Sequence, residues 1–188
     1  MSVHLPTTLP GCVLRPWRAE DKADLVRLAN NRRVWRNMTH TFPHPYTQED
    51  ADLWLRIAAH PGRSIQLAIA LHGQAVGGIG AIAGEGIQLA TAQFGYWLGE
   101  PFWGRGIATA AATSLAARIG DEALFARLEA QVFEWNPASM RVLEKAGFTR
   151  EAELRCAATK DGQLISTVLH ARVFPAHAGD GARRGATP

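Results

Sequence analysis

Two glycines flank a single arginine in the segment Trp103-Gly104-Arg105-Gly106-Ile107-Ala108-Thr109. A strand-like run from Gln93 to Leu98 precedes this segment, and an alanine-rich helical run follows it as far as Gly120. Glycine permits positive φ and close approach of another group, and the N–H groups at a helix N-terminus attract anions. The pattern predicts either a loop that wraps a phosphate, with Arg105 beside it, or a simple strand-to-helix turn.

Two familiar nucleotide-binding loops fit this segment poorly. A Walker A loop ends in Gly-Lys followed by Ser or Thr, and that ending is missing here. A dinucleotide fingerprint needs a third glycine where Thr109 stands, and its first glycine should follow the strand directly, whereas Gly99 to Trp103 intervene. The identity of a phosphate-bearing ligand must therefore come from elsewhere in the chain.

Composition narrows the class of protein. The 188 residues, 47% hydrophobic and 20% charged, suit one soluble domain with a substantial core. A net charge of +3 without a dense basic stripe argues against nucleic acid as a partner. Cys12 and Cys156 form no CxxC or Cys/His cluster, so we expect no metal. Without a signal peptide or a long apolar run, we expect no membrane partner and a cytoplasmic location.

The order of elements predicts an α/β (α+β) architecture. Residues 64–99 carry one formal charge, Glu85, which indicates the middle of a sheet. We expect an antiparallel meander here, then a helix at 107–119 that ends at Gly120 and returns to a strand parallel to the last of the meander. The remaining expectations are a flexible N-terminal arm (1–11), a single domain (12–174), a closing hairpin (148–157 with 164–174) and a disordered C-terminal tail (175–188).

Two segments, taken together, resemble the GCN5-related N-acetyltransferase (GNAT) superfamily in its ribosomal-protein, RimJ/RimL-like branch. Gly95–Thr109 (GYWLGEPFWGRGIAT) resembles the acetyl-CoA pyrophosphate loop, and Asn136–Phe148 (NPASMRVLEKAGF) resembles the Asn-x-x-Ser helix with its closing Gly-Phe. The resemblance covers roughly residues 13–174. It implies a GNAT fold: a central, mixed, mostly antiparallel twisted sheet of six to seven strands, a V-shaped splay between the fourth and fifth strands, and about four helices.

The resemblance also implies acetyl-CoA as cosubstrate. The loop amides would take the pyrophosphate, and the pantetheine arm would bond the open edge of the strand before the loop. Asn136 would contact the same arm, although simple helix capping explains this residue equally well. The coenzyme-binding residues implied in this way are Tyr96, Trp97, Leu98, Gly104, Arg105, Gly106, Ile107, Ala108, Thr109, Asn136 and Ser139.

The chemistry expected is direct attack of a primary amine on the thioester in a ternary complex. The resemblance gives Ser139 the role of protonating the leaving thiolate; ordinary chemistry near a helix N-terminus is the alternative. A family glutamate that often serves as base is replaced by Gln93, so Glu134 is the substitute candidate. Residues Trp35, His44 and Tyr46 would line the acceptor side, or belong to the core.

The predicted function is therefore an acetyl-CoA-dependent N-acetyltransferase. Its partners would be acetyl-CoA and an amine acceptor, either a protein N-terminal α-amine or a small-molecule amine, and the protein would be a monomer or homodimer. Because Gln93 cannot accept a proton at neutral pH, a non-catalytic acyl-CoA-binding module stays open as the alternative.

Overall fold

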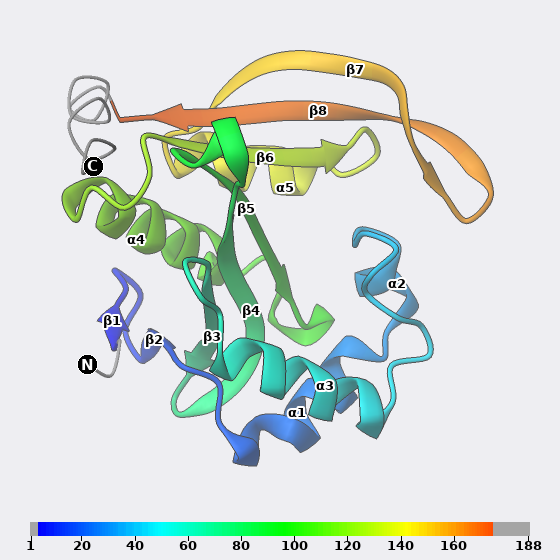
Figure 1. Cartoon of the computed structure of the whole chain (residues 1–188). Helices are drawn as coiled ribbons and strands as arrows, with labels where there is room; N and C mark the ends of the chain where they lie inside the picture. The colour runs from blue at the N-terminus through cyan, green and yellow to red at the C-terminus, as the bar shows by residue number, and fades with distance from the viewer. Residues whose placement is uncertain (1–3, 175–188) are drawn as a thin grey trace.

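A computed structural model describes residues 4–174 as an open eight-stranded sheet flanked by helices (Figure 1). Its strand order is β1-β2-β3-β4-β5-β6-β8-β7, and only the β5–β6 pair is parallel. The strands are β1 (Leu5–Pro6), β2 (Cys12–Arg15), β3 (Ile65–Leu71), β4 (Gln74–Ala83), β5 (Thr91–Leu98), β6 (Arg127–Phe133), β7 (Thr149–Lys160) and β8 (Gln163–Val173).

Five α-helices and three 3-10 turns connect these strands along residues 4–174. The helices are α1 (Lys22–Ala29), α2 (Arg32–Trp35), α3 (Gln48–Ala59), α4 (Ile107–Asp121) and α5 (Pro137–Lys145). The 3-10 turns are η1 (Ala19–Asp21), η2 (Gly86–Gln88) and η3 (Glu100–Phe102). None of the helices in this part of the chain is long and apolar enough to cross a membrane.

The predicted mixed, mostly antiparallel sheet is confirmed, with more elements than expected. The added strand is β1, which pairs antiparallel with β2 through Leu5↔Leu14 inside the segment expected to be a loose arm. Two residues are too few to show strand periodicity in a sequence. The fifth helix, α2, is a single turn of four residues where the sequence indicates a short helical piece (33–38). The predicted tail (175–188) and residues 1–3 lie outside the described residues.

The strands β5 and β6 diverge after a short stretch of pairing. Their register is limited to Thr91↔Arg127, Ala92↔Leu128 and Gln93↔Glu129, although β5 continues to Leu98 and β6 to Phe133. This is the predicted V-shaped splay, here between β5 and β6 because β1 adds one strand to the count. The splay leaves the far half of β5 with main-chain groups that no strand pairs on that side.

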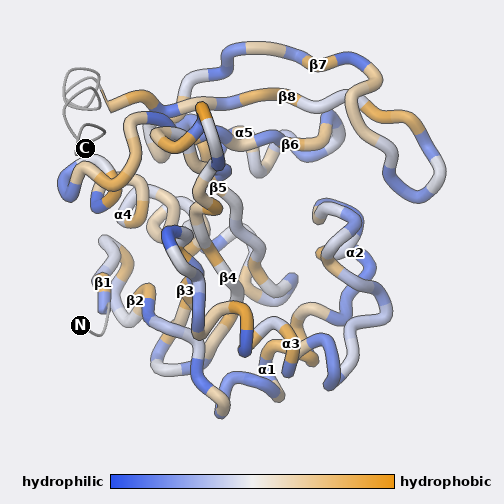
Figure 2. The backbone as a smooth tube through the Cα atoms, in the orientation of Figure 1, coloured by the Kyte–Doolittle hydropathy of each residue, from blue (hydrophilic) through white to orange (hydrophobic). Residues whose placement is uncertain are grey.

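Helices cover both faces of the sheet, and β5 contributes to both layers. Phe94 and Leu98 pack into the cluster beneath α4 and α5, whereas Trp97 packs into the cluster beneath α1 and α3. Opposite faces for neighbouring residues are what strand geometry requires. Ala111, Ala112 and Ala116 of α4 are fully buried, so small side chains let this helix lie close to the sheet. Figure 2 colours much of α4 as hydrophobic and the β7–β8 turn as hydrophilic.

The predicted helix end at Gly120 is wrong, since α4 continues to Asp121. The left-handed residue beyond the helix is Ala123, with φ 55°, and not the glycine. A Cβ on Gly120 would lie 2.6 Å from the Phe174 ring. Glycine is needed here for close packing against Phe174, which directly follows β8, and a local stop signal cannot reveal that contact.

A buried ion pair fixes the start of the first helical layer. The Arg15 guanidinium donates two 2.7 Å hydrogen bonds to the Asp21 carboxylate and a third, of 3.2 Å, to Gly73 O. Asp21 also accepts a hydrogen bond of 2.9 Å from the Arg18 N–H. The two charged side chains are 3% and 6% exposed, so each depends on the other for compensation.

The long β7–β8 hairpin, whose prediction is confirmed, curves toward α2 (Figure 1). Near its turn, Lys160 Nζ donates a hydrogen bond of 2.9 Å to Met38 O, and Asp161 forms an ion pair of 3.2 Å with Arg32. The hairpin turn is thereby held against α2 and the residues that follow it.

Candidate functional site

The glycine loop leads from η3 into α4 with an open backbone. Gly104 and Gly106 have φ of 74° and 75°, in the left-handed region that favours glycine. Gly106 is the N-cap of α4 and supplies no side-chain cap. A Cβ at either glycine would meet nothing within 4 Å. The N-terminus of this 15-residue helix is therefore accessible from outside.

The main-chain amides of the loop are available to a ligand. The first hydrogen bond of α4 runs from the Ala110 N–H to Gly106 O at 2.9 Å. Within residues 4–174, no group accepts a hydrogen bond from the amides of residues 104–109. The exposed Arg105 lies over the Phe102 ring at 5.7 Å and forms no ion pair with the described chain. Open amides, a helix dipole and a free guanidinium together make an anion site.

The splayed edge of β5 is joined to this anion site through η3. Trp97 and Leu98 are buried side chains of the two core clusters, so they offer only main-chain groups to the splay. One of those groups is already used, since Trp103 Nε1 donates a hydrogen bond of 2.7 Å to Leu98 O. The remaining edge is suited to an extended, amide-bearing chain that bonds it as an added strand would.

Ser139 meets β5 through the side chain of Tyr96. Ser139 Oγ lies 2.7 Å from the Tyr96 hydroxyl, which also donates to Ser139 O at 3.1 Å. Burial raises the pKa of Tyr96 to about 12, although the hydrogen bond with Ser139 lowers it. A tyrosine hydroxyl paired with a serine is thus held in its protonated form beside the splay. From the sequence, Tyr96 was expected to contribute only its main-chain groups to the open strand edge, and not its hydroxyl.

Asn136 caps α5, which was the alternative explanation for this residue. Its Oδ1 accepts a hydrogen bond of 3.2 Å from the Ser139 N–H. Pro137 follows at the first helical position, where its missing N–H costs nothing. The cap orients the first turn of α5 and, with it, the hydroxyl of Ser139.

Glu134 directly follows β6, and its hydrogen-bond partner is Ser166, not Ser139. Its Oε1 accepts a hydrogen bond of 3.0 Å from the Ser166 N–H, and its own N–H donates to Ser166 O at 3.1 Å. The residue is exposed, and Oε2 has no hydrogen-bond donor among residues 4–174. Gln93 is likewise exposed on β5.

Of the three expected acceptor residues, two lie together and the third is buried in the core. Trp35 and His44 are ring neighbours, with centroids 5.5 Å apart. Tyr46 is only 5% exposed and packs against Phe42 at 5.3 Å, so it is a core residue. The core alternative therefore describes Tyr46, while Trp35 remains at the surface of a pocket.

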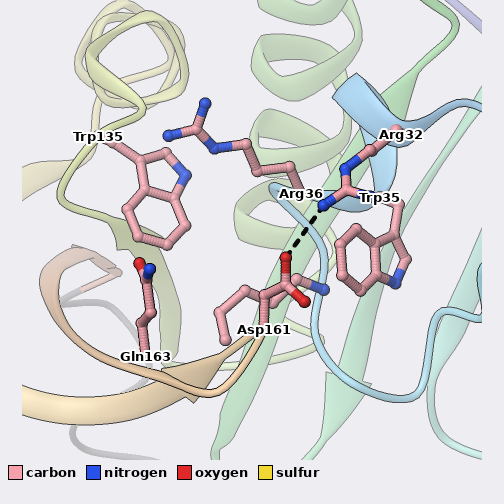
Figure 3. Close-up of a pocket in the computed structure, with 7 residues that line it drawn as sticks. Arg32, Trp35, Arg36, Trp135, Asp161 and Gln163 are labelled. Carbon is pink, nitrogen blue, oxygen red and sulfur yellow. Dashed lines mark hydrogen bonds and ion pairs between the residues drawn. The ribbon is translucent and has the colours of Figure 1, made fainter.

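That pocket, of about 310 Å³, lies between α2, the β6–α5 connection and the β7–β8 turn (Figure 3). The Lys160 ammonium lies 3.7 Å above the centre of the Trp35 ring, and burial lowers its pKa. Sequence reasoning found only Trp35, since the other side chains come from segments far apart in the chain. The lining residues are Arg32, Trp35, Arg36, Trp135, Lys160, Asp161 and Gln163.

Glu100 joins the glycine loop to the pocket. Its carboxylate accepts a hydrogen bond of 2.8 Å from Asn31 Nδ2 and forms an ion pair with Arg33. Asn31 is the N-cap of α2, and the Arg33 guanidinium lies over the Trp103 ring at 5.5 Å. The Glu100 charge beside the loop is plain in the sequence, but its pairing with Arg33, 67 residues away, cannot be read from it.

No group of three or more His, Cys, Asp or Glu side chains within residues 4–174 could hold a metal ion. The arrangement as described offers an anion site, an open β-edge, a serine hydroxyl and a separate pocket. Such a site can bind a long phosphorylated ligand and present its far end to a second molecule.

Comparison with known proteins supplies the family. Residues 12–149 match the model of the acetyltransferase (GNAT) domain, whereas no curated protein matches the sequence significantly. A RimL ribosomal L7/L12 alpha-N-protein acetyltransferase in complex with coenzyme A is similar in structure, with a TM-score of 0.81 and 22% identity over 93% of this chain and 99% of that one. RimJ from Mycobacterium smegmatis in complex with CoA-disulfide is also similar, with a TM-score of 0.77 and 26% identity over 93% of this chain and 88% of that one. The microcin C7 self-immunity acetyltransferase MccE, in complex with acetyl-CoA and AMP, has a TM-score of 0.74 and 21% identity over 88% of this chain and 93% of that one.

Proposed function

The chain belongs to the GNAT acetyltransferase family and is an N-acetyltransferase, and from that premise we propose that it moves the acetyl group of acetyl-CoA to a primary amine in a ternary complex. The acceptor would be a protein N-terminal α-amine or a small-molecule amine. Residues 12–174 would form the acetyltransferase domain. A cytoplasmic location and a monomeric or homodimeric state stay predictions.

The observation that carries this proposal is the combination of open loop amides with an open strand edge, joined in the chain through η3. The amides of residues 104–109 would bind the pyrophosphate, with Arg105 as an added cation. The unpaired edge of β5 at Tyr96, Trp97 and Leu98 would hold the pantetheine arm, with Asn136 on the opposite side. Main-chain N–H groups in this splay would polarise the thioester carbonyl.

The proton steps are assigned to two side chains. Attack of the amine forms the C–N bond and breaks the C–S bond, so the thiolate gains one proton and the amine loses one. Ser139 Oγ is the proposed proton donor, oriented by its 2.7 Å contact with the Tyr96 hydroxyl, and water would restore its proton after the thiol leaves. Glu134 Oε2 is the proposed base, acting directly or through one water, because Oε1 is engaged with Ser166.

Thiol release with acetyl-CoA tests the proposal against the non-catalytic alternative, which the exposed Gln93 favours. A panel of N-terminal peptides, polyamines and small amines should yield free thiol with at least one acceptor. Coenzyme binding without thiol release from any of them would favour the binding module.

The variant Ser139→Ala assigns the proton donor. We expect its kcat to fall about 10- to 100-fold, within the range for general acid catalysis, while the Kd for acetyl-CoA changes less than threefold. The control is Ser64→Ala, because the Ser64 hydroxyl accepts a hydrogen bond from the Ala83 N–H and from none of the residues assigned to the site. A fall in coenzyme affinity alone would make Ser139 a binding residue and remove its catalytic role.

A further inference from the structure

We propose that the pocket between α2, Trp135 and the β7–β8 turn selects acceptors that carry an anionic group, a carboxylate or a phosphate, close to the reactive amine. This rests on the proposed function, because it names the class of amine that the site would take. Neither the family model nor the fold specifies that class.

The charges that line the pocket are unbalanced. Three cations, Arg32, Arg36 and Lys160, face one acid, Asp161. The acid is paired with Arg32 at 3.2 Å, so it neutralises one cation and leaves two. Lys160 Nζ donates to a carbonyl, Met38 O, which removes no charge. Arg36 forms no ion pair within the described residues. A ligand group that completes this set of charges is negative.

The two tryptophan rings of the pocket also favour an anionic ligand over a cationic one. The Lys160 ammonium lies over Trp35 at 3.7 Å, and the Arg36 guanidinium lies over Trp135 at 5.0 Å. A cationic ligand such as a polyamine could gain from an indole face only by displacing a cation that already lies there. An anion would instead find a planar guanidinium held by its stacking, with N–H donors in a fixed fork.

The pocket is linked through the chain to the helix that carries Ser139 and to the glycine loop. Trp135 directly precedes Asn136, the cap of the helix that carries Ser139, and Trp135 Nε1 donates to Asn37 Oδ1 at 3.2 Å. On the other side, Glu100 ties the N-cap of α2 to the glycine loop. Figure 3 shows Arg36 reaching from α2 toward Trp135, across from Asp161 and Gln163. A group bound here would therefore lie on the acceptor side of the splay.

The test uses the full chain and acceptors that differ only in charge. Hexapeptides with one common N-terminal residue carry Asp, Asn or Lys at the second and third positions. Phosphoethanolamine and ethanolamine form the small-molecule pair, so that a preference confined to one pair identifies the source of the anion. We expect kcat/KM for the anionic member of the preferred pair to exceed that of its neutral member about tenfold, the effect of one partly exposed charge-assisted hydrogen bond.

Substitution of Arg36 locates the preference. Arg36→Gln should remove the tenfold advantage of the anionic acceptor and leave the neutral acceptor unchanged, and Arg36→Glu should favour the Lys peptide. Arg56→Gln, at an exposed arginine on α3, is the matched control. Equal use of neutral or Lys acceptors by the wild type, or an equal loss for all acceptors in Arg36→Gln, would overturn the inference.

Binding without turnover separates this inference from the proposed function. Calorimetry of the Asp and Asn peptides, and of the small-molecule pair, with the CoA-saturated protein should give about tenfold tighter binding of an anionic member even if no thiol is released. Absence of any such difference would refute the anionic pocket, whereas absence of thiol release with every acceptor would refute only the enzymatic role.

Discussion

Replacement of Gly106 by glutamate directly tests the anion site at the start of α4. Gly106 has φ of 75°, and its Cβ direction opens onto empty space beside the unpaired amides. A glutamate there would add a carboxylate within about one side-chain length of the proposed diphosphate. The substitution should therefore act through charge on the ligand, with little steric conflict inside the protein.

The size of the effect follows from Coulomb's law. Two unit charges about 6 Å apart, at an effective dielectric constant of about 40, interact by about 1.4 kcal/mol, so two phosphate charges give about 3 kcal/mol. This corresponds to about a 100-fold increase in Kd for acetyl-CoA. Left-handed strain adds about 1–2 kcal/mol to the cost of folding, which lowers Tm by roughly 2–8 °C in a chain of this size.

The assay is calorimetric titration with acetyl-CoA, supported by thermal unfolding. Gly106→Gln has nearly the same shape and strain without the charge, so the ratio of the two Kd values isolates electrostatics. Gly62→Glu is the control for the fold, because Gly62 has φ of 61° and an equally open Cβ direction, in the α3–β3 connection. If Gly106→Glu binds acetyl-CoA as tightly as Gly62→Glu does, the coenzyme does not use this loop.

Two further predictions concern groups that the fold buries. Asp21→Ala leaves the Arg15 guanidinium without its carboxylate at 3% exposure and should reduce the free energy of unfolding by about 3–5 kcal/mol in denaturant titration; a loss below 1 kcal/mol would show that water reaches the site. Burial raises the pKa of Tyr96 to about 12, above its unfolded value, so its contribution to stability is complete below pH 10 and is lost as the pH rises toward 12. In Tyr96→Phe this part of the alkaline decline, followed by thermal unfolding, should disappear; an unchanged decline would assign it to other groups.

The parts of the fold that depend on neighbouring residues were predictable. The strand at β5, the glycine loop and the alanine-rich α4 follow from periodicity, glycine chemistry and small side chains within one window of sequence. The parallel return to β6 follows from the handedness of such crossovers. Gly120 shows the limit, because its reason is the ring of Phe174, which no local pattern reveals.

The candidate site also has parts that local sequence predicts and parts that depend on tertiary contacts. The loop amides and the cap of α5 were identified from two contiguous motifs, since their geometry is set by local backbone. The pocket was not, because Trp35, Trp135 and Lys160 become neighbours only when the β7–β8 hairpin bends over α2. For Tyr46 the sequence left two places open, the acceptor side or the core, and the 5% exposure of its side chain matches the core.

The bridge made by Glu100 has a thermodynamic consequence. A coenzyme that immobilises the loop after η3 also immobilises, through Asn31 and Arg33, the turn of helix that carries Trp35 and Arg36. Reciprocity requires that the two substrates change each other's equilibrium affinity by one common factor, and ordering of a shared segment by the first substrate makes that factor favourable. Cooperativity between coenzyme and acceptor should therefore appear in titrations with an unreactive coenzyme, and it should vanish when Glu100 is replaced by alanine.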